Sequence, residues 1–211
     1  MKLYSYIVSH DTGFAPNPFF GYCTLACCKP PIRERAEVGD WIVGLEPKKT
    51  GHRIVYFMRV DDKIPFDRYW SDPRFRNKRP RPDDEVVRKC GDNIYESLPG
   101  GEYRQLRSVH SKECTEDPKK KAHDLKSKYV LISTTFSYFG SKTLPLPKQL
   151  AALVVQPGCR SRFSAEVIAA FLRYARRPKP GVHARPRCWP PGDRSWEAPS
   201  IPQTLEREDH P

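Results

Sequence analysis

The chain has 211 residues, with 37 Lys or Arg against 25 Asp or Glu, so its formal charge is +12. It contains no apolar run near the ~20 residues of a membrane span, and its first residues lack the apolar core of a secretory signal. We therefore expect a cytoplasmic protein without a membrane partner, and the seven irregularly spaced cysteines fit a reducing compartment. The positive excess favours a polyanionic partner, with nucleic acid first.

The predicted elements, in chain order, are short strands joined by irregular loops. Apolar, β-branched and aromatic residues predict strands at residues 3–8, 41–45, 53–61 and 129–133, while residues 22–28 fit a strand or a short helix. The strand at 53–61 is apolar on both sides, which is typical of a central strand. Ser164 is expected to cap a helix that continues to about residue 176. Few helices and several short strands predict an α+β fold, with a small curved β-sheet or barrel.

The C-terminal 36 residues differ from the rest in composition. Residues 176–211 contain eight prolines and only three aliphatic residues, Val182, Ile201 and Leu205. Such a segment buries too little apolar surface to offset its chain entropy. We therefore predict a folded domain over residues 1–175 and a largely disordered, Pro-rich tail over 176–211, whose Trp189 and Trp196 leave room for docking a protein partner.

The densest basic stretch covers residues 74–81. Its five cations, with no acid among them, are Arg74, Arg76, Lys78, Arg79 and Arg81. Cations at this density favour nucleic-acid binding, because each phosphate contact releases counterions. Pro80 and Pro82 favour an extended chain, so the run is a candidate arm along a nucleic-acid backbone. The alternative is an ordinary solvated loop.

Several aromatic residues are candidates for holding an unstacked base. Tyr22, Trp41 and Trp70 offer stacking faces, and in the sequence 91–95 the polar side chains of Asp92 and Asn93 precede Tyr95. Aromatic faces stack on bases, and carboxylate and amide groups read base edges. The alternative for each aromatic residue is a place in the core.

The cysteines do not follow a metal-binding pattern. Cys23, Cys27 and Cys28 have the spacing Cys-x3-Cys-Cys, and no second pair lies at zinc-ribbon distance. We predict buried, unreactive thiols and no metal or cofactor, since a Gly-rich phosphate loop is also missing. Two alternatives stay open: a nucleophilic cysteine paired with His110 or His123, and an acid–base pair formed by His123 and Asp124.

A set of short motifs resembles a known family. They lie at residues 13–19, 21–26, 38–44, 69–75 and 91–95, and together they resemble the nucleotide-modification-associated domain 2 family over about residues 1–165. A looser similarity to the PUA-like superfamily, which includes EVE domains, implies a small β-barrel with a few helices around it and a pocket for a modified base. The pocket candidates then include Asn17 beside the aromatic and polar residues named above.

Two functions follow from these observations. The first is a nucleic-acid-binding domain that recognises a modified base in DNA or RNA. The second is an enzyme that makes or removes a base or nucleotide modification, with Lys29, Asp92 and His110 as the first catalytic candidates because they are titratable groups inside the resembling region. A third reading is an interaction module that docks through the Pro-rich tail.

Overall fold

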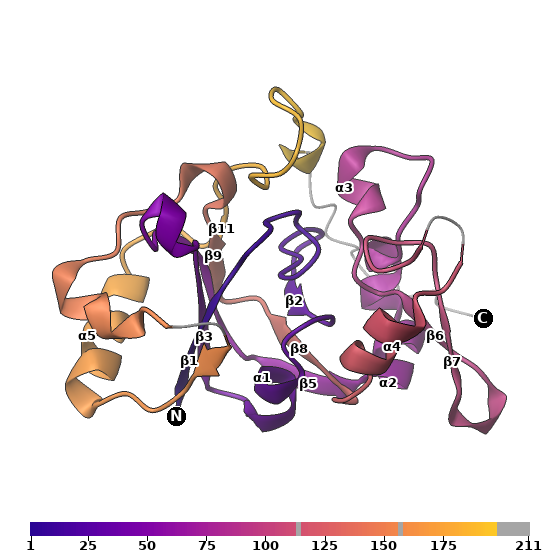
Figure 1. The fold of residues 1–211 in the computed structure, drawn as a ribbon, viewed down its shortest axis with the longest axis horizontal. Coiled ribbons are helices and arrows are strands. Elements are labelled where there is room, and N and C mark those ends of the chain that lie inside the picture. The colour runs from indigo at the N-terminus through magenta and orange to yellow at the C-terminus, as the bar shows by residue number, and fades with distance from the viewer. Residues whose placement is uncertain (113–114, 156–157, 198–211) are drawn as a thin grey trace, which may run out of the picture.

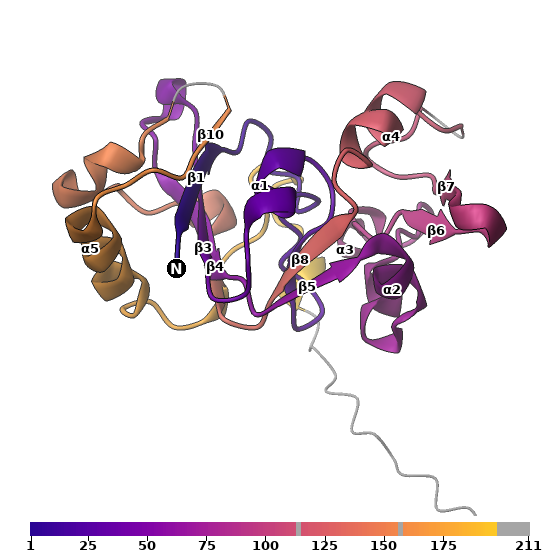
Figure 2. The same cartoon turned by 90° about the horizontal axis from the view of Figure 1, so that it is seen from below.

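The computed structural model describes residues 1–112, 115–155 and 158–197, which form a mixed α/β fold around two main sheets (Figures 1 and 2). The larger sheet has the strand order β10-β1-β3-β4-β9-β11. Its strands are β1 (Leu3–Ile7), β3 (Trp41–Leu45), β4 (Ile54–Arg59), β9 (Phe136–Tyr138), β10 (Cys159–Arg160) and β11 (Gly181–Val182). β1 and β3 are parallel, whereas β3, β4 and β9 pair antiparallel in turn.

The second sheet has the order β2-β8-β5, and the chain connects it to the first sheet at two places. Its strands are β2 (Cys23–Leu25), β5 (Asp62–Pro65) and β8 (Tyr129–Ser133), and a separate hairpin joins β6 (Tyr95–Ser97) to β7 (Tyr103–Gln105). The chain crosses between the sheets from β4 to β5 and again from β8 to β9. At the second crossing the Asp61 carboxylate accepts the backbone N–H groups of Thr134 and Thr135 at 2.9 and 3.0 Å.

These sheets confirm the mixed class with short strands, but not the barrel. In the described part of the chain the outer strands β10 and β11 do not pair with each other, so the six-stranded sheet stays open. The PUA-like barrel expected from the looser similarity is therefore not confirmed.

Helices cover the sheets on both sides. The α-helices are α1 (Pro30–Arg35), α2 (Phe66–Ser71), α3 (Val86–Lys89), α4 (Pro118–Asp124) and α5 (Ala165–Ala175). The 3-10 helices are η1 (Lys48–Thr50), η2 (Pro73–Lys78), η3 (Pro99–Gly101), η4 (Gly140–Lys142), η5 (Lys148–Leu153) and η6 (Ser195–Glu197). None of the helices that the structure describes is long and apolar enough to cross a membrane.

The core has two main layers, separated by β4. Tyr56 and Met58 face the core between the two sheets, while Phe57 packs with Phe171 of α5 on the opposite face. This confirms β4 as a central strand. The Ser164 hydroxyl accepts the backbone N–H of Val167, which confirms the predicted start of α5.

The segment 176–197 is packed against the body and differs from the disordered tail that its composition predicts. β11 pairs with β9, and the Arg185 carbonyl accepts the N–H of Ser141 at 2.8 Å. A Cβ on Gly140, whose φ is 52°, would lie 2.2 Å from that same carbonyl oxygen, so the approach requires glycine. Backbone pairing thus replaces the missing aliphatic contacts. The expectation for residues 198–211 lies outside the described residues.

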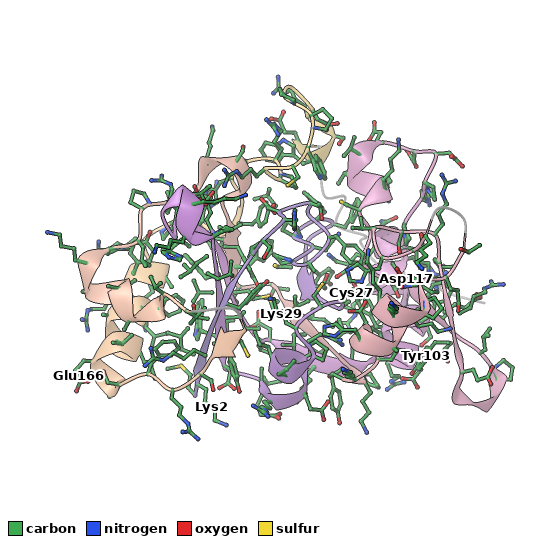
Figure 3. The ribbon with its side chains drawn as sticks, in the orientation of Figure 1. Lys2, Cys27, Lys29, Tyr103, Asp117 and Glu166 are labelled. Atoms are coloured by element: carbon green, nitrogen blue, oxygen red, sulfur yellow. The ribbon has the colours of Figure 1, made fainter. Side chains whose placement is uncertain are left out.

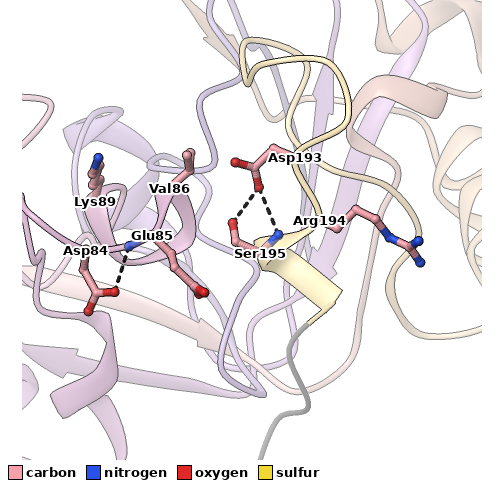
Figure 4. Close-up of a pocket in the computed structure, with 7 residues that line it drawn as sticks. All are labelled: Asp84, Glu85, Val86, Lys89, Asp193, Arg194 and Ser195. Carbon is pink, nitrogen blue, oxygen red and sulfur yellow. Dashed lines mark hydrogen bonds between the residues drawn. The ribbon is translucent and has the colours of Figure 1, made fainter.

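Trp189 anchors this segment. Its ring stacks on Phe19 at 5.3 Å between centroids, and its indole N–H donates to the Thr12 carbonyl at 2.7 Å. Further along, the segment forms a hollow of about 480 Å³ with α3, where the Ser195 hydroxyl donates to Asp193 (Figure 4). The folded unit therefore includes residues 176–197.

Replacing Trp189 by alanine is expected to lower the free energy of unfolding by about 3 kcal/mol, because a large buried aromatic side chain and its hydrogen bond are lost together. Urea unfolding measures this change. Trp196→Ala serves as the matched control, since Trp196 is only partly buried, and a loss below about 1 kcal/mol is expected there. Equal losses in the two variants would contradict the anchoring role of Trp189.

Candidate active site

Three side chains from distant parts of the sequence form one hydrogen-bonded chain. The Cys28 Sγ lies 3.4 Å from the His110 Nε2, and the His110 Nδ1 lies 2.6 Å from the Asp124 Oδ2. Figure 3 labels Cys27 and Lys29, the neighbours of Cys28, in the middle of the molecule on the side of β1 that faces α4. The order thiol, imidazole, carboxylate is that of a nucleophile, its base and the group that orients the base.

Cys28 lies in a sharp turn between β2 and α1. Its φ is 60° and that of Lys29 is 42°, so two successive non-glycine residues adopt the left-handed conformation, at a cost of about 1–2 kcal/mol each. Pro30 then begins α1, whose first position accepts proline well. A strained strand-to-helix turn is also the local structure that presents the nucleophile in many hydrolases.

The Asp124 carboxylate contacts both of the other residues in this hydrogen-bonded set, Cys28 and His110. It lies in the last turn of α4, and its side chain is fully buried. One carboxylate oxygen accepts the backbone N–H of Cys28 at 2.7 Å, and the other accepts the Tyr95 hydroxyl at 2.9 Å as well as His110. Burial alone raises the pKa of Asp124, but its hydrogen bonds, that from His110 first, bring the pKa below its ordinary value.

His110 is fixed from several directions. Its ring packs on Phe14 with 4.6 Å between centroids, and its carbonyl accepts the Gln105 amide at 3.3 Å. Burial lowers the pKa of the imidazole, but the hydrogen bonds to Asp124 and Cys28 outweigh burial and raise the pKa to about 9. His110 is therefore an imidazolium near neutral pH, where it can stabilise a neighbouring thiolate and donate a proton.

Arg33 connects the nucleophile turn to the segment that carries Asp124. This guanidinium is fully buried, and it donates to the carbonyl of Cys28 at 2.8 Å. It also donates to the carbonyls of Ser127 and Tyr129, at 3.1 and 2.7 Å, and to the carbonyl of Asp124. Arg33 therefore fixes the distance between the thiol and the carboxylate without touching either side chain.

A metal site is a second interpretation of part of this cluster. Ligand atoms of Cys27, His110 and Asp124 lie within 4.8 Å of one another. Two ligands held at about 2.0–2.2 Å from one tetrahedral zinc ion lie roughly 3.3 Å or more apart. The His110 and Asp124 atoms are only 2.6 Å apart, and burial raises the pKa of the Cys27 thiol well above its ordinary value. This geometry fits a direct hydrogen bond better than a shared ion.

The three catalytic candidates from the sequence have different fates. His110 is part of the Cys28–His110–Asp124 triad. Lys29 directly follows Cys28, and its Nζ lies 4.9 Å from the centre of the Tyr6 ring. Asp92 is fully buried elsewhere, where it accepts the hydroxyls of Thr24 and Tyr69. The alternative of a cysteine paired with His110 matches the geometry. His123 is exposed, and Asp124 pairs with His110 instead.

The predicted base-pocket residues do not line one open pocket. Asn17, Asp92 and Asn93 are all buried, and the amide of Asn93 donates to the carbonyls of Tyr69 and Phe75. The amide of Asn17 donates to the carbonyls of Gly13 and Cys90, and the carboxylate of Asp92 accepts the hydroxyl of Thr24.

The aromatic members of that set lie in separate places. Tyr22 packs edge-on against Phe75, whereas the partly buried Trp41 packs against Phe57 and Phe171 at α5. Trp70 is covered by the Arg79 guanidinium, 3.7 Å from its ring centre. Tyr95 alone reaches the triad, through its hydroxyl on Asp124. The assignment of a base pocket to these residues stays a prediction.

The basic run 74–81 is folded, and two of its five cations pair with acids, in contrast to the extended arm predicted for it. Residues 73–78 form η2, and Arg74 makes a bidentate pair with Asp72. Lys78 is fully buried and donates to two oxygens of Asn17 and to the Tyr22 carbonyl. Arg79 donates to the Trp70 carbonyl, and Arg81 pairs with Asp84 at 3.8 Å. Arg76 alone of the five is exposed and outside the ion pairs of the described residues.

The fold and the site together define a mixed α/β protein with a hydrogen-bonded cysteine–histidine–aspartate triad at a strand-to-helix turn. The chain belongs to the nucleotide modification associated domain 2 family, whose model matches residues 1–191. This confirms the resemblance drawn from the motifs and extends it into the packed C-terminal segment, while the looser PUA-like similarity is not shown. No curated protein and no solved structure matches the chain.

Proposed function

We propose that this protein is a thiol-dependent enzyme of nucleotide modification, with Cys28 as nucleophile, His110 as general base and acid, and Asp124 as the group that orients His110. The observation that carries the proposal is the continuous hydrogen-bond chain from the Cys28 Sγ through His110 to Asp124. Membership of the family connects the chain with nucleotide modification, and the triad supplies the chemistry.

The triad supports group transfer at an electrophilic carbon of a nucleotide or of a group attached to it. The Cys28 sulfur loses its proton to solvent, and the thiolate, paired with the His110 imidazolium, forms a bond to that carbon. The bond to the leaving group then breaks, and His110 donates its proton to the leaving group. Water or an amine next attacks the same carbon and loses a proton to the neutral His110. The carbon–sulfur bond breaks, which restores the thiolate and the imidazolium.

The turn that carries Cys28 also offers a group for the developing negative charge. Among the described residues the Lys29 N–H has no protein acceptor, and the next two residues are prolines without an N–H. The N–H of the residue after a nucleophile is a usual oxyanion donor. The substrate reaches the site from solvent, because Cys28 is half-buried and the His110 side chain is 13% exposed.

Recognition of a modified base without catalysis has less support. That function needs accessible aromatic faces beside polar groups. Asn17, Asp92, Asn93 and Tyr95 are buried instead, with hydrogen bonds to protein groups. The triad, in contrast, ends in a half-buried thiol that contacts His110.

Selective alkylation of Cys28 is the first expected result. At pH 7 iodoacetamide is expected to modify Cys28 roughly tenfold faster than the exposed thiols Cys159 and Cys188, because the Cys28 Sγ lies within hydrogen-bond distance of the His110 imidazole. Peptide mapping by mass spectrometry measures the three rates in one chain. His110→Ala should remove the preference for Cys28 and leave the two exposed thiols unchanged. If the three thiols are modified at rates that follow only their exposure to solvent, Cys28 is not an activated nucleophile.

The enzymatic step is tested on nucleic acids and nucleotides directly. Purified protein is incubated with DNA, RNA or mixed nucleotides, and the digested nucleosides are analysed by mass spectrometry. A mass change that disappears in Cys28→Ser and His110→Gln supports the proposal. A mass change that persists in Cys28→Ser, or that depends on Asp92 and not on Cys28, contradicts it.

A further inference from the structure

The excess positive charge is concentrated in one segment that none of the functions above uses. Residues 140–179 contain one acid, Glu166, and eight cations. The cations are Lys142, Lys148, Arg160, Arg162, Arg173, Arg176, Arg177 and Lys179. We call this set the α5 cationic face. Its net charge is +7 of the +12 of the whole chain, although the segment has only 40 residues.

These cations remain available to a partner. All eight are exposed, and none takes part in an ion pair among the described residues. The run 74–81 is the useful contrast, because there Arg74 and Arg81 pair with acids and Lys78 is buried. Exposed like charges repel one another, so an anionic partner that neutralises these eight unpaired cations binds favourably.

The helix α5 lies at the end of the molecule opposite to α4 and the β6–β7 hairpin, in both views of the fold (Figures 1 and 2). The strand β10, which carries Arg160, pairs with β1 on the inner side of that end. Figure 3 shows Glu166 of α5 at this end and Asp117, the cap of α4, near the other. Apolar side chains of α5, Phe171 among them, pack inward, so the helix is rigidly held while its polar side faces solvent.

We infer that the α5 cationic face binds the phosphate backbone of a nucleic-acid duplex. A dense, exposed array of Arg and Lys on one face is the electrostatic footprint of a phosphate-binding surface. Single-strand binding needs exposed aromatic side chains on which bases stack. The aromatic side chains around α5 that are not fully buried, Trp41, Phe163 and Tyr174, pack against the apolar cluster under the helix, so the face suits a duplex held through its phosphates.

This inference goes beyond the proposed reaction and is independent of it. It makes the partner a polymer and not only a free nucleotide, and it places the contact on a surface that contains no triad residue.

The triple substitution Arg173→Gln, Arg176→Gln and Arg177→Gln removes three of the eight cations. The matched control is Lys119→Gln, Lys120→Gln and Lys126→Gln, which removes three exposed cations at the α4 end.

Fluorescence anisotropy with a labelled 20-base-pair DNA duplex, measured between 50 and 200 mM salt, tests the inference. The wild type is expected to bind with a steep salt dependence, and the arginine triple variant to bind about tenfold more weakly at the higher salt, with a slope reduced by up to about 3. The lysine control should change affinity less than twofold. Both variants should unfold at the wild-type urea concentration, because all six side chains are exposed.

Several outcomes would overturn the inference. They are undetectable duplex binding, equal losses in the two triple variants, tighter binding of single-stranded DNA that the arginine substitutions leave unchanged, and binding only to vesicles of anionic lipid. The selective alkylation of Cys28 is measured in the same arginine variant. If alkylation is normal while duplex binding is lost, the surface and the triad are separate functions, and failure of one does not imply failure of the other.

Discussion

Arg33→Met is expected to lower the free energy of unfolding by about 4 kcal/mol, a large part of the 5–15 kcal/mol typical of a domain. The guanidinium is fully buried and donates to the carbonyls of Cys28, Asp124, Ser127 and Tyr129. Methionine fills a similar volume but leaves those buried carbonyl oxygens without donors, and each such group costs about 1–3 kcal/mol. Urea unfolding followed by circular dichroism measures the loss.

The same substitution should also slow the alkylation of Cys28 under conditions where the variant is still folded. The left-handed backbone at Cys28 is held by Arg33 on its carbonyl and by Asp124 on its N–H. Removal of one contact lets the turn relax, so the thiol leaves its place beside His110. Arg35→Met is the matched control, since Arg35 is on the same helix but exposed, and it should alter neither quantity.

Arg33→Lys separates charge from geometry. A lysine keeps the positive charge but donates from a single point, so it cannot reach four carbonyls in different directions. We expect the lysine variant to recover less than half of the stability that the methionine variant loses, and little of the Cys28 reactivity. Full recovery of both by lysine, or an unchanged alkylation rate in Arg33→Met, would contradict a positioning role for Arg33.

The sequence predicts best those features that depend on neighbouring residues. The two-sided apolar pattern identifies β4 as a central strand, and the Ser164 cap identifies the start of α5. The family motifs also belong to this class, because each is a short continuous stretch, and the family match confirms them.

Charge and disorder are harder to place because both depend on distant partners. Lys78 looks like part of a solvated basic run, yet it is buried against Asn17, 61 residues earlier. Trp189 lies in a segment poor in aliphatic residues, yet it docks on Thr12, 177 residues earlier. Composition averages over a window and carries no information on such contacts, which fold the basic run 74–81 and residues 176–197 onto the body.

The triad is predicted only in part, for a related reason. Cys28 and His110 are 82 residues apart, and Asp124 is 14 residues beyond His110. The adjacent pair His123 and Asp124 suggests an acid–base unit, but His123 is exposed while Asp124 is buried. A usable signal is present at Cys28 itself, since a thiol just before Lys29 and two prolines, after a predicted apolar strand, indicates a strand-to-helix turn.

The His110–Asp124 pair should make stability fall as the pH rises from 6.5 to 8. The pKa of His110 is raised from 6.5 to about 9 in the folded protein, so the folded state holds this proton more tightly than the unfolded state. The resulting stabilisation is complete below pH 6.5 and is lost as the pH rises through about 9. Within the window from pH 6.5 to 8 we expect a loss of about 1.5 kcal/mol.

The upper limit of that window is set by Lys78. Burial lowers its pKa to about 8, and a lysine with a lowered folded pKa contributes the opposite slope above that pH, because the unfolded state then binds more protons. Urea unfolding at half-unit pH steps, for wild type and His110→Gln, isolates the imidazole. The glutamine variant should show a flat profile in this window, and an unchanged downward slope in it would mean that His110 does not carry the proton that the triad requires.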